Sequence, residues 1–167
     1  NDTTRAGTTS GLKGRKRSLH EGGVRVPFIV RWPGKVAAGK LDETSMLSTV
    51  DLLPTFASLA GAELPNGYRP DGESIVDIFH GSVHQRTKPL FWQWRFADRN
   101  GRVPANWPGA AIRHGEWKLL AGPDGKRVEL YNIVSDRGEA TNLAAERAEI
   151  AGRLKAQLDA WQAELPK

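Results

Sequence analysis

The 167 residues of the chain allow one domain, or a domain with an appendage, and 39% hydrophobic with 26% charged residues is ordinary for a globular protein able to bury a core. The absence of cysteine excludes disulfides and thiolate metal sites, and no apolar run approaches the length of a transmembrane helix. A net charge of +5 fits an anionic ligand, but it fits many basic proteins equally well.

After a polar segment over residues 1–11, which predicts a loop, comes a glycine-punctuated basic segment that leads into an apolar run over residues 26–30. The pattern predicts a basic loop followed by a strand, and Gly22-Gly23 permits a close approach of other backbone. The four cations, in five positions, are Lys13, Arg15, Lys16 and Arg17. Such a cluster suits an oxyanion, although basic clusters are also found on solvated surfaces and nonspecific nucleic-acid patches.

The order of residues in this segment resembles the signature G-K-x-x-x-x-E-G-G-x-R-x-P of the sulfatases, the formylglycine-dependent sulfate ester hydrolases of the alkaline phosphatase superfamily. The matching residues are Gly14, Lys16, Glu21, Gly22, Gly23, Arg25 and Pro27. Residues 31–34, 51–55 and 136–144 also resemble segments of that family. The resemblance therefore covers nearly the whole chain, but only the C-terminal part of a sulfatase.

The resemblance implies roles for three residues. Lys16 would contact the sulfate, because the family's lysine at this place offsets charge on the transferring group; without the family pattern it would be an ordinary surface lysine. His20 would form part of the loop wall and contact substrate. Asn1 would belong to the Asp-Asn pair that ligates a divalent cation, usually calcium, although Asp2 replaces the glycine that normally follows. A plain terminal-loop asparagine is the alternative.

The family's nucleophile has no counterpart here, because the chain has no cysteine and no serine in a C/S-x-P-S-R motif. The Asp-rich metal ligands and catalytic histidines of the N-terminal part also lack counterparts. The resemblance implies that the formylglycine of the complete enzyme attacks sulfur, while the cation and Lys16 stabilise the sulfuryl oxygens. We therefore expect this chain to supply one wall of the site, to need the N-terminal part as its partner, and to be inactive alone.

Residues 33–83 carry signals for one short strand and two helices. Residues 46–50 form a β-like run, and Asp51 is a suitable N-cap for a helix over residues 52–60 that ends at Gly61. Residues 74–81 predict a short capped helix. His80 and His84 have a zinc-chelating spacing, but Gly81 interrupts the helix, which favours exposed histidines without a metal.

The polar stretch 84–89 predicts a boundary between two units, residues 1–83 and 84–167. Short strands over residues 90–94, 110–113, 117–120 and 128–131 predict an antiparallel meander. Apolar residues from Ile150 to Leu165 recur at helical spacing, which predicts a helix covering that sheet.

The expected fold is α/β: the C-terminal part of an alkaline-phosphatase-like α/β sandwich, followed by a small antiparallel sheet packed by a C-terminal helix. Separated from its other strands, the first unit would expose an apolar edge.

The tryptophans divide into two groups. Strand alternation predicts that at least half of Trp92, Trp94 and Trp117 are sheet core. Trp107, in the loop over residues 95–107 with three arginines, fits a substrate-facing rim that stacks on sugar rings of a sulfated glycan.

The resemblance implies hydrolysis of aryl or carbohydrate sulfates, in the periplasm or outside the cell. A phosphate or phosphonate monoester hydrolase of the same superfamily would use a similar frame. If the chain were instead a non-catalytic module that binds sulfated glycans, its affinity for sulfated sugars would persist without calcium and would depend on salt concentration. A nucleic-acid binder is disfavoured, because the cations cluster in one loop and no recognised motif is present.

Overall fold

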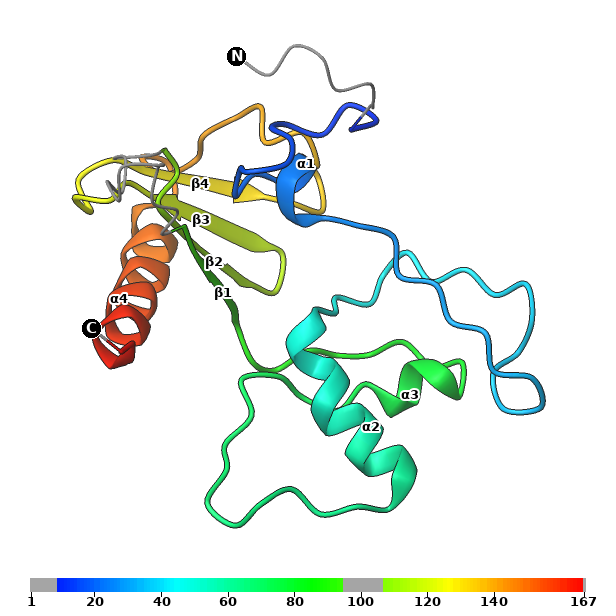
Figure 1. Cartoon of the computed structure of the whole chain (residues 1–167). Helices are drawn as coiled ribbons and strands as arrows, with labels where there is room; N and C mark the ends of the chain where they lie inside the picture. Colours follow the sequence, from blue (N-terminus) through cyan, green and yellow to red (C-terminus); the bar gives the residue numbers. More distant parts are fainter. Residues whose placement is uncertain (1–8, 95–106, 167) are drawn as a thin grey trace, which may run out of the picture. The chain divides into compact units, whose positions relative to one another are not determined.

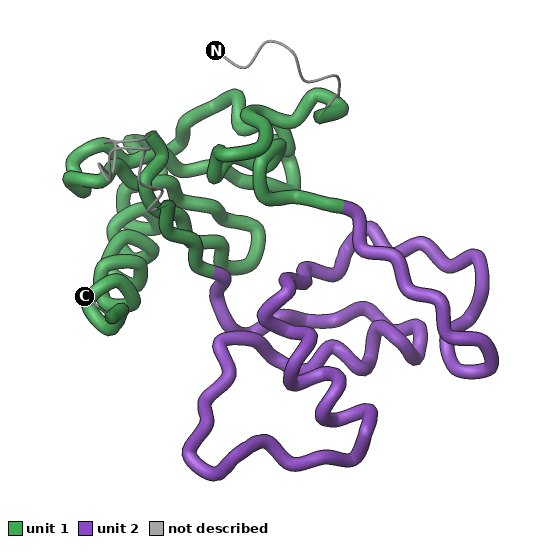
Figure 2. Tube along the Cα trace, in the orientation of Figure 1, with its two compact units in different colours: residues 1–26, 91–167 green, residues 27–90 purple. Residues whose placement is uncertain are grey.

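The computed structural model describes residues 9–94 and 107–166. The chain forms two compact units: unit 1 comprises residues 1–26 and 91–167, and unit 2 comprises residues 27–90 (Figure 2). The basic loop therefore lies with the C-terminal sheet and not with the segment that directly follows it. The boundary predicted between residues 83 and 84 stays a prediction.

Unit 1 is built on a four-stranded sheet in the order β1-β2-β3-β4 (Figure 1). The strands are β1 (Leu90–Gln93), β2 (Ala110–His114), β3 (Trp117–Ala121) and β4 (Val128–Asn132). β2 and β3 pair antiparallel with Ile112 opposite Leu119, and β3 and β4 with Leu119 opposite Leu130. The predicted meander is confirmed.

The helix α4 (Ala148–Glu164) covers one face of this sheet (Figure 1). Leu154 and Leu158 are fully buried against Ile112, Leu119 and Leu130. At the edge of the sheet, the ring of Trp161 stacks on Phe91 with centroids 4.9 Å apart. The amphipathic pattern predicted this helix correctly, because a sheet of this size needs an apolar cover.

The opposite face of the sheet carries the basic loop and the short helix α1 (Glu21–Val24). Strand alternation sends Leu120 and Tyr131 to this face, where they form a core with Leu19 of the loop. Trp92, Trp94 and Trp107 pack against this core, whereas Trp117 packs on the face covered by α4. The prediction that strand tryptophans belong to the sheet core is confirmed.

Unit 2 contains the 3-10 turn η1 (Thr49–Asp51) and the helices α2 (Leu52–Ala60) and α3 (Val76–Phe79). α2 ends at Gly61, whose φ of 64° places it in the left-handed region typical of a helix C-terminus. Both predicted helices are confirmed.

Two strands predicted in this part are wrong. Residues 26–32 have no strand partner among the described residues, and a strand exists only through pairing. Their apolar side chains are instead exposed, 74% for Val26 and 88% for Ile29, which agrees with the exposed apolar edge expected of the first unit. The β-like run over residues 46–50 ends in η1, because Asp51 accepts a hydrogen bond from the Ser48 N–H and tightens the turn.

Candidate anion-binding site

The basic loop closes on itself through its glycines. The Gly22 N–H donates to the Lys13 carbonyl at 2.8 Å, so residues 13–22 form a closed ring. A Cβ at Gly22 would overlap the Gly14 carbonyl, and one at Gly23 would overlap the Ser18 carbonyl. The Glu-Gly-Gly sequence is therefore a steric requirement of this loop.

The centre of the ring presents its cations to solvent. Arg15, Lys16 and Arg17 are all exposed. Lys16 has no hydrogen-bond or ion-pair partner within residues 9–94 and 107–166. An ammonium without a protein partner on a closed loop has its three N–H donors available for an anion.

The base of the loop is fixed by buried charges. The Glu21 N–H donates to Oε2 of Glu139 at 2.7 Å, and the Lys118 ammonium donates to Oε1 of Glu21 at 2.8 Å. Lys118 also lies 3.1 Å from Oε1 of Glu139. All three side chains are almost completely buried. Charges in such a site are stable only when they are paired.

His20 lies inside this base. It is 7% exposed, and its Nδ1 is 3.3 Å from Oε2 of Glu139. Burial would raise the pKa of Glu139, but the contact with His20 and the charge of Lys118 outweigh it and lower that pKa. The structure thus places His20 against a carboxylate, and its contact with substrate stays a prediction.

A second set of contacts runs from the loop along β4. The Lys13 ammonium donates to the Tyr131 hydroxyl and to the Glu139 carbonyl, both at 3.1 Å. The Tyr131 hydroxyl in turn donates to Oε2 of Glu129 at 2.6 Å. Burial and this bond to a carboxylate raise the pKa of Tyr131.

Trp107 lies on the same face of the sheet as the loop. Its half-buried ring packs on the core formed by Leu19, Leu120 and Tyr131. The Arg127 guanidinium lies 3.9 Å from the ring centroid and donates to Glu129 at 2.7 Å. The structure therefore brings Lys16, His20 and Trp107 to one side of unit 1, while Asn1 and residues 95–106 lie outside the described residues.

Lys118, Glu139 and Tyr131 are missing from the sequence-based site. The only sequence signal for this group was Lys118 itself, a lysine inside an otherwise apolar strand, Trp117-Lys118-Leu119-Leu120. A charged residue at an inward position of a small sheet indicates a buried partner. The partner itself is distant in sequence and was not identifiable from the pattern.

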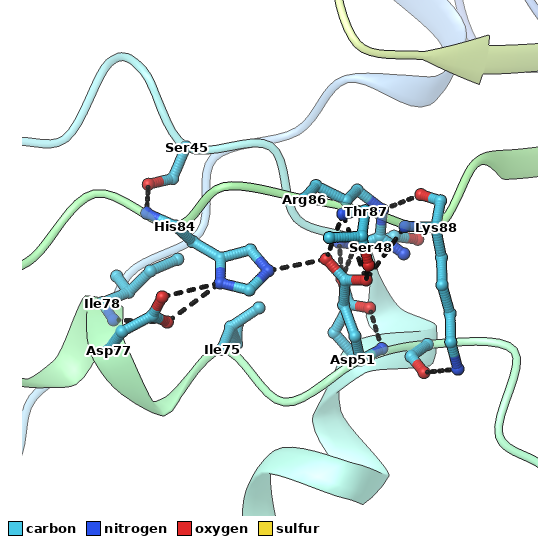
Figure 3. A network of polar contacts seen from close by, with 12 residues as sticks. Ser45, Ser48, Asp51, Ile75, Asp77, Ile78, His84, Arg86, Thr87 and Lys88 are labelled. Atoms are coloured by element: carbon cyan, nitrogen blue, oxygen red, sulfur yellow. Dashed lines mark hydrogen bonds and ion pairs between the residues drawn. The ribbon is translucent and has the colours of Figure 1, made fainter.

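A separate polar network lies within unit 2 (Figure 3). His84 contacts Oδ2 of Asp77 through Nδ1 and Oε1 of Glu73 through Nε2, both at 2.8 Å. The prediction that His84 is exposed is wrong, because these carboxylates hold its ring with only 9% of the side chain accessible; His80 is exposed as expected. With both nitrogens engaged, His84 fastens its segment to α3 and has no free lone pair for chemistry.

The described residues do not form a metal centre. They contain no group of three or more His, Asp or Glu side chains arranged to hold a metal ion. The calcium that the resemblance implies would need ligands outside these residues.

Unit 1 thus has a small antiparallel sheet, a helix that covers one face, and on the other face a closed loop that contains Lys16 and the Glu21-Gly22-Gly23 segment. This is the arrangement expected from the resemblance to the C-terminal part of a sulfatase. The chain belongs to the family described as N-sulphoglucosamine sulphohydrolase, C-terminal, which matches residues 14–164. The recognition made from the loop signature is confirmed.

Named relatives and solved structures agree with this assignment. The chain is 34% identical to a sulfatase of Formosa agariphila over 91% of this chain and 29% of the relative. It is 31% identical to human arylsulfatase A over 94% of this chain and 35% of the relative. The crystal structure of Ps i-CgsB in complex with a neocarrahexaose superposes with a TM-score of 0.73 and 29% identity, over 90% of this chain and 31% of that chain. The chain thus spans about a third of the length of the proteins it matches.

Among the described residues, no helix is both long and apolar enough to cross a membrane.

Proposed function

We propose that this chain is the C-terminal part of an enzyme that hydrolyses sulfate esters, and that Lys16 binds the sulfate group. The observation that carries the proposal is the exposed ammonium of Lys16, which has no partner among the described residues and lies on a loop closed by glycines and fixed by buried charges. An ammonium held in place beside a sulfuryl oxygen offsets charge that grows as the leaving oxygen departs. Arg15 and Arg17 add a positive field that attracts the anion.

The nucleophile and the calcium ligands belong, in this proposal, to the part of the enzyme outside this chain. The 167 residues alone are therefore inactive, and turnover of an aryl sulfate by them would contradict the proposal. The complete enzyme acts in the periplasm or outside the cell, which fractionation of cells that express it tests.

The role of Lys16 is tested in the complete enzyme with Lys16→Ala. Loss of one charge-stabilising donor lowers kcat by about a hundredfold or more. Arg153→Ala is the matched control, because Arg153 is an exposed cation on α4, on the far side of the same sheet. Arg153→Ala should keep full activity with aryl sulfates. If Lys16→Ala keeps full activity as well, Lys16 does not bind the sulfate. Assays of the same enzyme with phosphate and phosphonate monoesters test the alternative that it is a phosphate or phosphonate monoester hydrolase.

We propose sulfated carbohydrates as the substrate class. Trp107 offers an aromatic ring on the face that carries the basic loop, with Arg127 beside it. Among the relatives, one from Bacteroides thetaiotaomicron is an N-acetylgalactosamine-6-O-sulfatase, 27% identical over 88% of this chain and 29% of that protein. Trp107→Ala lowers kcat/KM for a carbohydrate sulfate and leaves that for para-nitrophenyl sulfate unchanged. An equal fall for both substrates contradicts a sugar-binding role.

A further inference from the structure

Strand β3 carries a lysine that no solvent reaches. Lys118 is 0% exposed, although its neighbours Trp117, Leu119 and Leu120 form an ordinary apolar strand. Alternation directs Leu119 toward α4 and Lys118 toward the basic loop. A lysine is almost never fully buried unless it is paired, so this position has a specific function in the fold.

The ammonium of Lys118 joins three segments that are far apart in the chain. It donates to Glu21, 97 residues earlier, and lies 3.1 Å from Glu139, in the segment after β4. The other cations near Glu21 are more distant, with Arg25 at 3.8 Å and Arg113 at 3.9 Å from its Oε2. Among the ion pairs of the described residues, Lys118 therefore makes the shortest contact with each of the two buried carboxylates, and His20 lies 3.3 Å from Glu139.

Both ends of the basic loop attach to the carboxylate residues that Lys118 holds. At one end, the Lys13 ammonium donates to the Glu139 carbonyl. At the other end, the Glu21 N–H donates to the Glu139 carboxylate, and the next residue, Gly22, closes the ring to Lys13. Lys16 lies between these two attachment points, so the position of its ammonium depends on them.

We propose that Lys118 is a positioning residue for sulfate binding: through Glu21 and Glu139 it holds the loop in the conformation that presents Lys16. The inference rests on the proposed role of Lys16. It extends the functional set of residues to a side chain that touches no substrate and lies beneath the loop, on the sheet.

The test is a double-mutant cycle in the complete enzyme with Lys118→Met, which keeps the length of the side chain and removes its charge. If Lys118 acts through Lys16, Lys118→Met lowers kcat/KM about tenfold or more per folded molecule, since small misplacements are costly. In the Lys16→Ala background the same substitution then has little further effect. Losses that multiply in the double variant overturn the inference.

Leu119→Ala is the matched control. It truncates the adjacent residue of the same strand on the opposite face, so it weakens the same sheet without touching the loop. Activity per folded molecule stays unchanged in this variant. If Lys118→Met does not fold, Glu21→Gln replaces it, because it keeps the shape of the side chain and removes one buried charge.

Limited trypsin digestion tests the anchoring without any assay of activity. Cleavage after Arg15, Lys16 and Arg17 becomes at least several-fold faster in Lys118→Met and Glu21→Gln, but not in Leu119→Ala. Unchanged cleavage in the first two variants overturns the anchoring. If Lys16→Ala is fully active while cleavage accelerates as expected, the proposed role of Lys16 fails and Lys118 remains the anchor of the loop only.

Discussion

Arg86 and Asp51 form an ion pair of 2.7 Å in which both side chains are almost completely buried. Asp51 directly precedes α2, but its carboxylate makes no cap bond to that helix. Instead it accepts from the Ser48 and Glu73 N–H groups and from Arg86. The N-cap role predicted for Asp51 is therefore wrong; the carboxylate connects η1, the segment before α3 and the chain leading to β1.

Arg86→Met leaves the Asp51 carboxylate buried without its counter-charge. Breaking a buried pair in this way costs about 3–5 kcal/mol, which we expect as a loss in the free energy of unfolding measured with urea. Arg69→Ala, at an exposed arginine of the same unit, changes it by less than about 0.5 kcal/mol. A loss below 1 kcal/mol for Arg86→Met would show that Asp51 finds other compensation.

His84 makes the stability of unit 2 depend on pH. Burial would lower the pKa of His84, but the contacts with Asp77 and Glu73 raise it above its ordinary value of 6.5. A group whose pKa is higher in the folded than in the unfolded state stabilises the folded protein fully at pH values below its unfolded-state pKa. This contribution is lost as the pH rises through its folded-state pKa. We therefore expect the free energy of unfolding, measured with urea, to fall more between pH 6 and pH 9 in the parent protein than in His84→Gln.

Glu73 sets the acid limit of the same network. Burial would raise the pKa of Glu73, but hydrogen bonds from the Lys88 N–H, His84 and Thr87 lower it from 4.5 to about 2. Its contribution is present above pH 4.5 and disappears as the pH falls toward 2. The free energy of unfolding of Glu73→Gln should thus be lower than that of the parent near pH 6, and the difference between the two proteins should shrink in acid. Equal differences at pH 6 and pH 3 would contradict this assignment.

The sequence was sufficient for elements whose partners are close along the chain. The meander and α4 were predictable because period-2 and helical patterns are local, and tight turns such as His114-Gly115 join neighbouring strands. The run over residues 26–30 has the composition of a strand, but composition does not supply the partner on which a strand depends.

The candidate site was predictable only in part for the same reason. The loop signature identified Lys16 and the glycines, whose steric role the structure explains. Lys118 and Glu139 join the site through contacts with Glu21, which is about a hundred residues earlier in the chain, and no local pattern specifies such pairs. For His84, the two carboxylates that enclose it are seven and eleven residues earlier, but His84 lies outside any helix or strand, so no periodic pattern predicts that these side chains meet.

Tyr131 should not ionise in the ordinary range of a phenol. Its hydroxyl is held between the Lys13 ammonium and the Glu129 carboxylate, and burial with the bond to that carboxylate raises its pKa. The absorbance at 295 nm, followed from pH 8 to pH 11, should therefore change equally in the parent protein and in Tyr131→Phe. A larger change in the parent would mean that Tyr131 ionises and that the bond to Glu129 is not maintained.

Two glycines in unit 1 should respond to alanine in opposite ways. Gly22→Ala forces a Cβ against the Gly14 carbonyl, so the ring opens or shifts and the ammonium of Lys16 is misplaced. We expect kcat/KM of the complete enzyme for a sulfate ester to fall about tenfold or more. Gly152 lies inside α4 with nothing within 4 Å of the added Cβ. Gly152→Ala therefore raises the free energy of unfolding by about 0.5–1 kcal/mol, because alanine loses less backbone entropy in a helix, and leaves kcat/KM unchanged. Full activity of Gly22→Ala would show that sulfate binding does not require the closed loop.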